Sequence, residues 1–208
     1  AFGSGMTPSV NNARKAAEAL KEKYPDRKLI IVDSLCSCCG YGLLVDSAAD
    51  VRDNGADIEE TAIFAEENST RVCHQFFSTD IKYFKRSGRV SGPAATVASI
   101  LGICPIMHLD LQGKIVAYDK ARGKKNAVNA TVNEILEQAD NGKDYDGKCF
   151  IGQSNCMEDA LMTASAIEKA MPNLKGKIKI FDIGTIIASH CGPGTVAVFF
   201  FGTKTHVA

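Results

Sequence analysis

The sequence predicts an α/β protein with two domains: an open, mostly parallel α/β/α sheet domain over residues 1–78, followed by an α+β domain over residues 79–208. Two observations predict this fold class. Before Ser78, short apolar runs alternate with helical segments, which is the pattern of an open sheet covered by helices. After Ser78, the pattern changes to a hairpin, several helices and further strands, which is typical of an α+β unit.

The first domain is expected to contain three helices and two strands. Thr7 is the predicted N-cap of the first helix, and Pro8 is its first residue. The run at 28–34 is short, apolar and β-branched, which predicts a buried parallel strand. A second helix is expected over 40–55 and stops at Gly55. A third is expected over 57–67, where Asp57 and Glu60 have the spacing of a capping box. A strand over 71–78 completes the domain.

The second domain is expected to mix helices with short strands. Its apolar periodicity predicts helices over 79–88, 92–102, 124–140 and 157–172. The predicted strands are a hairpin over 105–120 that turns at Gln112–Gly113, followed by 148–154, 177–184 and 195–203.

Composition excludes several classes of protein. Lys plus Arg number 24 and Asp plus Glu number 24, so no overall basic field attracts nucleic acid or an acidic membrane. No apolar run approaches the roughly 20 residues that span a bilayer. The 8 cysteines among 208 residues are too few for a disulfide scaffold. We therefore expect reduced thiols and a cytoplasmic location.

The N-terminal stretch FGSGMTPS has the pattern of an anion-binding loop. A glycine-rich loop leads into a helix N-terminus, and the hydroxyls of Ser4, Thr7 and Ser9 lie close by in the sequence. Backbone N–H groups and the helix dipole would point at the same place. Two alternatives remain open: a purely capping role, and a cloning scar that ends before Met6.

Two basic clusters stand out in a chain without net charge. Arg86 lies in the last turn of a predicted helix, where the dipole favours a cation, whereas Arg89 lies beyond Gly88. Arg122 belongs to a second cluster between a strand end and a helix start, together with Lys120, Lys124 and Lys125. A phosphate, an acidic partner surface or a solvated loop would each account for these cations.

Cysteine and histidine residues suggest further chemistry. Cys36 and Cys39 have the C-x-x-C spacing of a metal or redox site, but no second such motif supplies four ligands, so inert packed thiols are the simpler interpretation. His190 and Cys191 could form a base and nucleophile, although neighbours in an extended segment face opposite sides. His190 is otherwise a hydrogen-bonded turn residue or a group that contacts ligand.

Taken in order, several segments resemble the DegV family of bacterial fatty-acid-binding proteins. Residues 3–17 resemble its Ser-Ser-Gly-Leu-Ser-Gly-Thr-Tyr loop, and residues 30–60 match its Asp-Ser strand end and following helices. Residues 83–127 are similar to its Leu-Lys-Arg-Gly-Gly-Arg-Ile, Lys-Pro-Ile and Lys-Arg-Gly elements, and residues 188–200 to its Thr-His-Thr-Gly-Pro-Gly ending. The resemblance covers essentially the whole chain.

The resemblance implies a function and a set of residues. In this family a long-chain fatty acid occupies a tunnel between the two domains, and several members are the FakB carrier subunit of fatty acid kinase. By resemblance, Ser4, Thr7 and His190 bind the carboxylate. The resemblance also implies that Arg122, Arg86 and Arg89 dock a separate ATP-dependent kinase subunit or steady the phosphate, and that this subunit forms acyl phosphate for phospholipid synthesis. The chain would then be a non-catalytic carrier without a cofactor, metal or nucleic-acid partner, and we expect a monomer.

The sequence also departs from the family pattern. The resemblance implies that an N-terminal segment of family members is absent here. Gly3 replaces the first serine of the loop, Ser87 a glycine, Cys104 the lysine of Lys-Pro-Ile, and Cys191 the threonine after the histidine. Two alternatives to the carrier stay open: an acyl hydrolase or transferase using His190 with Ser4 or Cys191, and a thiol metal or redox protein using Cys36 and Cys39.

Overall fold

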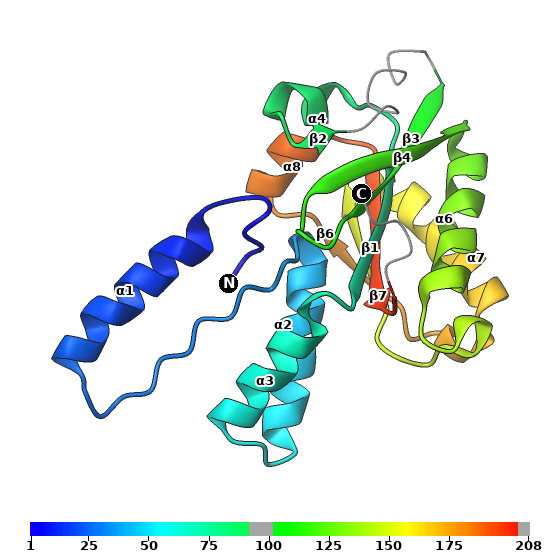
Figure 1. Ribbon diagram of the computed structural model, residues 1–208. Coiled ribbons are helices and arrows are strands. Elements are labelled where there is room, and N and C mark those ends of the chain that lie inside the picture. Colours follow the sequence, from blue (N-terminus) through cyan, green and yellow to red (C-terminus); the bar gives the residue numbers. More distant parts are fainter. Residues whose placement is uncertain (92–101, 204–208) are drawn as a thin grey trace.

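A computed structural model describes residues 1–91 and 102–203 of the chain (Figure 1). The helix expected over 92–102 falls almost wholly outside the described residues. In chain order the elements are α1 (Ser9–Lys23), α2 (Cys38–Asp53), α3 (Ile58–Ser69), β1 (Val72–Ser78), α4 (Lys82–Ser87), β2 (Val90–Ser91), β3 (Ile103–Leu109), β4 (Ile115–Arg122), α6 (Lys124–Gln138), β5 (Phe150–Ser154), α7 (Met157–Ala170), β6 (Lys179–Asp182), α8 (Thr185–Cys191) and β7 (Thr195–Phe201).

The described strands form one sheet in the order β2-β4-β3-β1-β7-β5-β6. The pairs β1–β3, β1–β7, β3–β4 and β5–β7 are antiparallel, whereas β2–β4 and β5–β6 are parallel. The α/β class is therefore confirmed, and the expected, mostly parallel arrangement is corrected to a mixed sheet. The hairpin at Gln112–Gly113 is confirmed with longer outer ends, at Ile103 and Arg122, and the strands at 148–154, 177–184 and 195–203 are confirmed with shorter bounds.

The strand expected at 28–34 does not form. Ala1 donates a hydrogen bond to the Val32 carbonyl and accepts one from the Ser34 N–H, so the two segments run side by side without a full ladder. Leu29 and Ile30 remain 36% and 37% exposed, respectively. The apolar pattern predicted burial, but a strand needs a hydrogen-bonding neighbour along its length, and within the described residues this segment has one only at its end.

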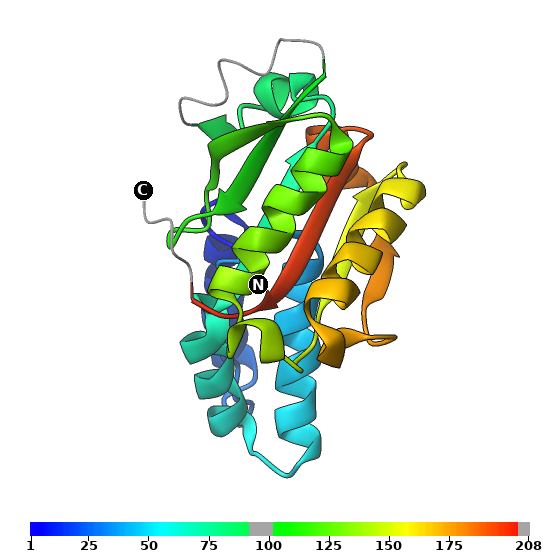
Figure 2. The ribbon, with the colours of Figure 1, turned by 90° about the vertical axis from the view of Figure 1, so that its right-hand side faces the viewer.

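β1 lies at the centre of the sheet, and all of its residues are buried. Its side chains alternate between two apolar clusters, as the pleat of a strand requires. Cys73 and Phe77 pack into a cluster under α6 and α7, whereas Val72 and Phe76 pack into a cluster under α2, α4 and α8. Figure 2 shows α6 and α7 side by side across the first of these faces.

The division into domains at residue 79 stays a prediction. The structure places β1, which precedes this position, between β3 and β7, which follow it. The first helices lie towards one end of the sheet, where α1 extends away from the body and α2 pairs with α3 (Figure 1). α1 buries little more than Val10 and Ala17 against its surroundings.

The helix ends follow the local signals of the sequence. α1 begins at Ser9, one residue later than expected, and the Thr7 hydroxyl accepts a hydrogen bond from the Ser9 N–H at 3.1 Å. The predicted capping box of α3 is confirmed, because the Asp57 carboxylate accepts from the Glu60 N–H and the Glu60 carboxylate accepts from the Asp57 N–H. A short helix that the sequence did not predict, α8, ends at Cys191.

Replacing Asp57 by alanine should lower the free energy of unfolding by about 1 kcal/mol, because the first turn of α3 loses its side-chain acceptor. The matched control is Asp57→Asn, which retains a capping oxygen and should cost much less. Urea unfolding followed by circular dichroism measures both variants. Equal midpoints for the two variants would contradict the assigned cap.

Candidate functional site

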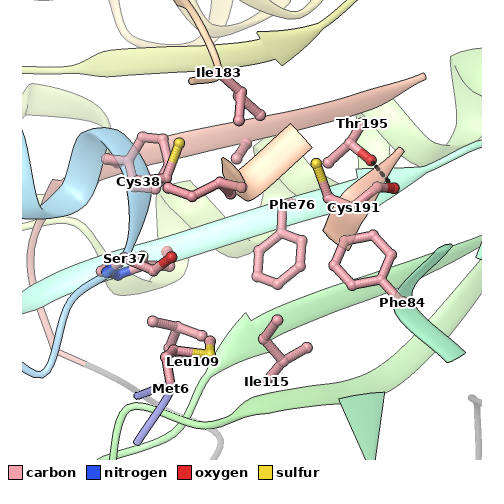
Figure 3. A pocket seen from close by; sticks show the side chains of 14 residues that line it. Met6, Ser37, Cys38, Phe76, Phe84, Leu109, Ile115, Ile183, Cys191 and Thr195 are labelled. Carbon is pink, nitrogen blue, oxygen red and sulfur yellow. Dashed lines mark hydrogen bonds between the residues drawn. The ribbon is translucent and has the colours of Figure 1, made fainter. Parts of the chain in front are cut away.

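A cavity lies on the face of the sheet that α6 and α7 leave uncovered. It consists of an inner part and an outer part that share the side chains of Met6, Ser37, Phe84, Ile115, Ile187 and Cys191. The space between the atoms of the inner part, including what is open to solvent, is about 390 Å³. Its further lining residues are Cys38, His74, Phe76, Leu109, Ile183, Thr195, Ala197 and Phe199 (Figure 3).

The lining of the inner part is largely apolar because each wall contributes a hydrophobic side chain. The sheet provides Phe76 from β1, Phe199 from β7 and Leu109 from β3. α4 and α8 close the other side with Phe84 and Ile187, and Figure 3 shows Phe76 among the labelled side chains that ring the space. The arrangement can hold an extended apolar group.

The outer part, which forms the mouth of the cavity, adds three polar side chains to those of the inner part. It adds Phe2, Thr7, Arg89, Ile186 and His190 to the shared residues. Two residues predicted to bind the carboxylate, Thr7 and His190, and one of the predicted docking arginines, Arg89, therefore meet at this mouth. Ile186 stands beside them with 77% of its surface exposed.

The N-terminal loop reaches the cavity because Gly5 has no side chain. A Cβ at Gly5 would lie 2.2 Å from the carbonyl oxygen of Gln112, in the turn between β3 and β4. The loop is also tied to the segment before α2, because the Gly3 N–H donates to the Cys36 carbonyl at 2.9 Å. These contacts bring Met6 and Thr7 to the cavity wall.

Ser4 and Thr7 have different surroundings. The Thr7 hydroxyl donates to the Ser9 hydroxyl at 2.8 Å and lies at the cavity mouth. Ser4 is exposed and lies outside both sets of lining residues, and its N–H donates to the Asp33 carboxylate at 3.1 Å. Partial burial tends to raise the pKa of Asp33, but hydrogen bonds from Ser4 and Leu35 outweigh this and keep the pKa below its ordinary value.

His190 lies in the last turn of α8, not in the extended segment that the sequence suggested. Its carbonyl accepts a long hydrogen bond from the Ser87 hydroxyl, at 3.4 Å, which links α8 to α4. The next residue, Cys191, is buried, and burial raises the pKa of its thiol to about 11. A protonated thiol at neutral pH is a poor nucleophile, which disfavours a His190–Cys191 hydrolase.

The three arginines do not gather at one place. Arg89 directly precedes Val90, which lies opposite Ile115 at the start of β4, whereas Arg122 is the last residue of β4. At about 3.3 Å per residue, the length of β4 separates its two ends by about 23 Å. The Arg86 guanidinium stacks over the Tyr83 ring at 5.1 Å on α4. Arg86 therefore lies on α4, which also contributes Phe84 to the outer part of the cavity, whereas Arg122 lies at the end of β4 that is distant from the cavity.

Sequence reasoning missed a buried histidine in the inner cavity. The Nε2 atom of His74 accepts the Ser37 N–H at 3.1 Å, and its Nδ1 atom lies 3.0 Å from the Val72 carbonyl. These partners assign the proton to Nδ1 and leave the ring neutral. A signal was available, because His74 shares the strand face of Phe76 under period-2 alternation.

The thiols are arranged differently from the C-x-x-C interpretation. Cys36 is fully buried, and its thiol donates to the Ser69 carbonyl at 3.7 Å. The sulfurs of Cys38 and Cys39 lie 3.8 Å apart instead. Within residues 1–91 and 102–203, no group of three or more His, Cys, Asp or Glu residues is arranged to hold a metal ion.

Comparison with known proteins decides the family. The family model described as "Uncharacterised protein, DegV family COG1307" matches residues 1–203. A DegV domain-containing protein of Clostridium perfringens is 37% identical over 202 residues, which cover 97% of this chain and 68% of that protein. This chain belongs to the DegV family. A DegV domain-containing protein of Clostridium acetobutylicum is 33% identical and covers 98% of this chain and 69% of its own length.

Solved DegV structures have the same fold. The Streptococcus pneumoniae fatty acid kinase B3 protein loaded with linoleic acid matches with a TM-score of 0.85 at 23% identity, over 96% of this chain and 69% of that one. A DegV family protein from Eubacterium eligens loaded with heptadecanoic acid matches with a TM-score of 0.85 at 20% identity, over 98% and 71% of the two chains.

Among the described residues of this DegV chain, no helix is both long and apolar enough to cross a bilayer.

Gly192→Ala should destabilise the protein by about 1–3 kcal/mol. Gly192 has φ +75°, which strains any other residue, and a Cβ there would lie 2.2 Å from the Tyr83 ring. Gly184→Ala, at the other end of α8, is the matched control, because a Cβ there meets nothing within 4 Å. Thermal unfolding measures both variants, and equal melting temperatures would contradict the proposed packing of α8 on α4.

Proposed function

We propose that this DegV chain binds one long-chain fatty acid in the cavity under α8 and presents its carboxylate to a separate ATP-dependent kinase subunit. The observation that carries the proposal is the division of the cavity. Its inner part is lined by side chains such as Phe76, Leu109 and Phe199, and its outer part holds Thr7, Arg89 and His190.

The apolar part supplies the affinity for the acyl chain. Each CH₂ group that leaves water contributes about 0.8 kcal/mol, so a chain of many carbons gains most of its binding energy here. The walls contributed by Phe84, Ile115 and Ile187 continue from the inner part into the mouth. An acyl chain can therefore stay against apolar side chains along its length.

The mouth supplies partners for the carboxylate, whose burial without partners would be costly. The Thr7 hydroxyl and the His190 imidazole can donate hydrogen bonds, and Arg89 adds a positive charge at the same opening. Ser4 remains a proposed ligand by resemblance. The anionic Asp33 that accepts its N–H would oppose a second carboxylate, so we assign the head group first to Thr7 and His190.

The role of carrier rather than enzyme is supported by the site and by the relatives. Cys191, the nucleophile of the alternative hydrolase, is buried with a raised pKa. A structural neighbour is the B3 protein of a fatty acid kinase. In the proposed reaction the partner subunit transfers phosphate from ATP to the bound carboxylate, while Arg86 and Arg89 steady the head group and the distant, exposed Arg122 contacts the partner.

His190→Ala should weaken fatty acid binding roughly tenfold, because one hydrogen bond to a charged group is lost. Ser189→Ala is the matched control, since Ser189 is exposed and its hydroxyl donates within α8 to the Ile186 carbonyl. Displacement of a fluorescent fatty acid measures the affinities, and mass spectrometry of extracted lipid identifies the natural ligand. Unchanged affinity in His190→Ala would remove His190 from the site.

Arg122→Ala should lower the rate of acyl phosphate formation by the kinase subunit while leaving fatty acid affinity unchanged. Lys120→Ala is the matched control, because Lys120 is an exposed cation on the same strand. Phosphate transfer from labelled ATP and fatty acid displacement are measured on the same preparations. If fatty acid affinity falls as much as the rate, Arg122 does not act through docking.

A further inference from the structure

Two consecutive cysteines at the start of α2 bring their sulfurs together. The Sγ atoms of Cys38 and Cys39 lie 3.8 Å apart, and both side chains are half-buried. Successive side chains of a regular helix point about 100° apart, which separates them. Here Ser37 is extended and Cys38 has φ +50°, and this irregular start turns the two thiols towards each other.

The separation of the sulfurs does not favour a disulfide between neighbours. A disulfide needs an S–S bond of about 2.05 Å and Cα atoms about 4.4–6.8 Å apart, whereas consecutive Cα atoms lie about 3.8 Å apart. A soft atom bound to both sulfurs is a better fit. Two bonds of about 2.3 Å at a tetrahedral angle place their sulfurs about 3.8 Å apart.

The pair is closely packed against Gly152 of β5 on one side, and Cys38 borders the inner cavity on the other. Gly152 of β5 faces the pair, and a Cβ at this position would lie 3.2 Å from the Cys39 sulfur and 3.4 Å from the Cys38 sulfur. Cys38 also lines the inner cavity, together with Phe76 and Ile183 (Figure 3). A group attached to the bound atom can therefore extend against apolar walls.

The ionisation of the pair suits a site with two sulfur ligands. The hydrogen bond between the thiols raises the pKa of Cys38 and lowers that of Cys39, so Cys39 is the sulfur that loses its proton first. Because the described residues provide no cluster of three metal-binding side chains, a zinc-type site with four protein ligands is not built here. The geometry suits a bound atom that has only two sulfur ligands from the protein.

We propose that Cys38 and Cys39 form a two-thiolate site for a soft, thiophilic metalloid or metal centre that carries an apolar substituent. A monosubstituted trivalent arsenical, R–As=O, is the simplest ligand of this class. Two arsenic–sulfur bonds form, the bonds between arsenic and oxygen break, and the oxygen leaves as water with the two thiol protons. No oxidant or reductant is needed, because arsenic remains trivalent and the sulfurs are not oxidised.

The test is titration of the intact chain with phenylarsine oxide, followed by native mass spectrometry. We expect one phenylarsenic group per chain, released by excess ethanedithiol. Cys38→Ser and Cys39→Ser should each weaken capture roughly 100-fold or more, because the second bond is then no longer intramolecular. Cys156→Ser is the matched control, since Cys156 is equally half-buried and its thiol donates to the Thr195 carbonyl.

Two results would overturn the proposal: full affinity in Cys39→Ser, or an equal loss in Cys156→Ser. Peptide mapping of the adduct on the unsubstituted chain locates the arsenic even if a variant fails to fold, and a site away from Cys38 and Cys39 would also overturn it. Capture is measured on the chain without added fatty acid, so its outcome does not depend on the proposed fatty acid function. Displacement of a fluorescent fatty acid by phenylarsine oxide is therefore a separate readout, which reports whether the two sites share the cavity.

Discussion

The architecture depends on the placement of β1 between β3 and β7. Every residue of β1 is buried, and its hydrogen-bonded partners come from segments that follow it by about 30 and about 120 residues in the chain. Because its side chains alternate between faces, this one strand contributes to both apolar clusters. The seven residues of β1 therefore lie between the two layers of helices and contact both.

The two faces of the sheet are filled in different ways. Two long helices, α6 and α7, lie across one face and leave a dense core of residues such as Ile135, Ile151 and Phe200. The other face receives α2, which packs Leu43 and Leu44 into the second cluster, together with the shorter α4, α8 and the N-terminal loop. Short elements meet at their ends rather than along their lengths, so their side chains do not close the space between them, and the cavity remains there.

The closures around this cavity depend on backbone contacts at small residues. Gly5 lies against the turn of the β3–β4 hairpin, and Gly192 lies against the Tyr83 ring at the end of α8. Both contacts hold in place an element that carries a side chain of the mouth, Thr7 in one case and His190 in the other. The polar mouth and the apolar interior are therefore parts of one packing arrangement.

The sequence by itself determined the local elements: the capping box of Asp57 and Glu60, the hairpin at Gln112–Gly113, most helices, and the buried strand at 71–78. Local propensity and periodicity decide these features within a few residues of the chain. Tertiary structure decided the rest. It set the mixed strand order, left the apolar run at 28–34 without a ladder and placed His74 in the cavity. It also separated Arg122 by about 23 Å from the end of β4 that lies near Arg89. Finally, it brought the sulfurs of Cys38 and Cys39 to 3.8 Å from each other. Pairing partners and contacts between distant segments are not encoded in the periodicity of either segment, because burial fixes which side of a strand faces inward but not which strand lies beside it.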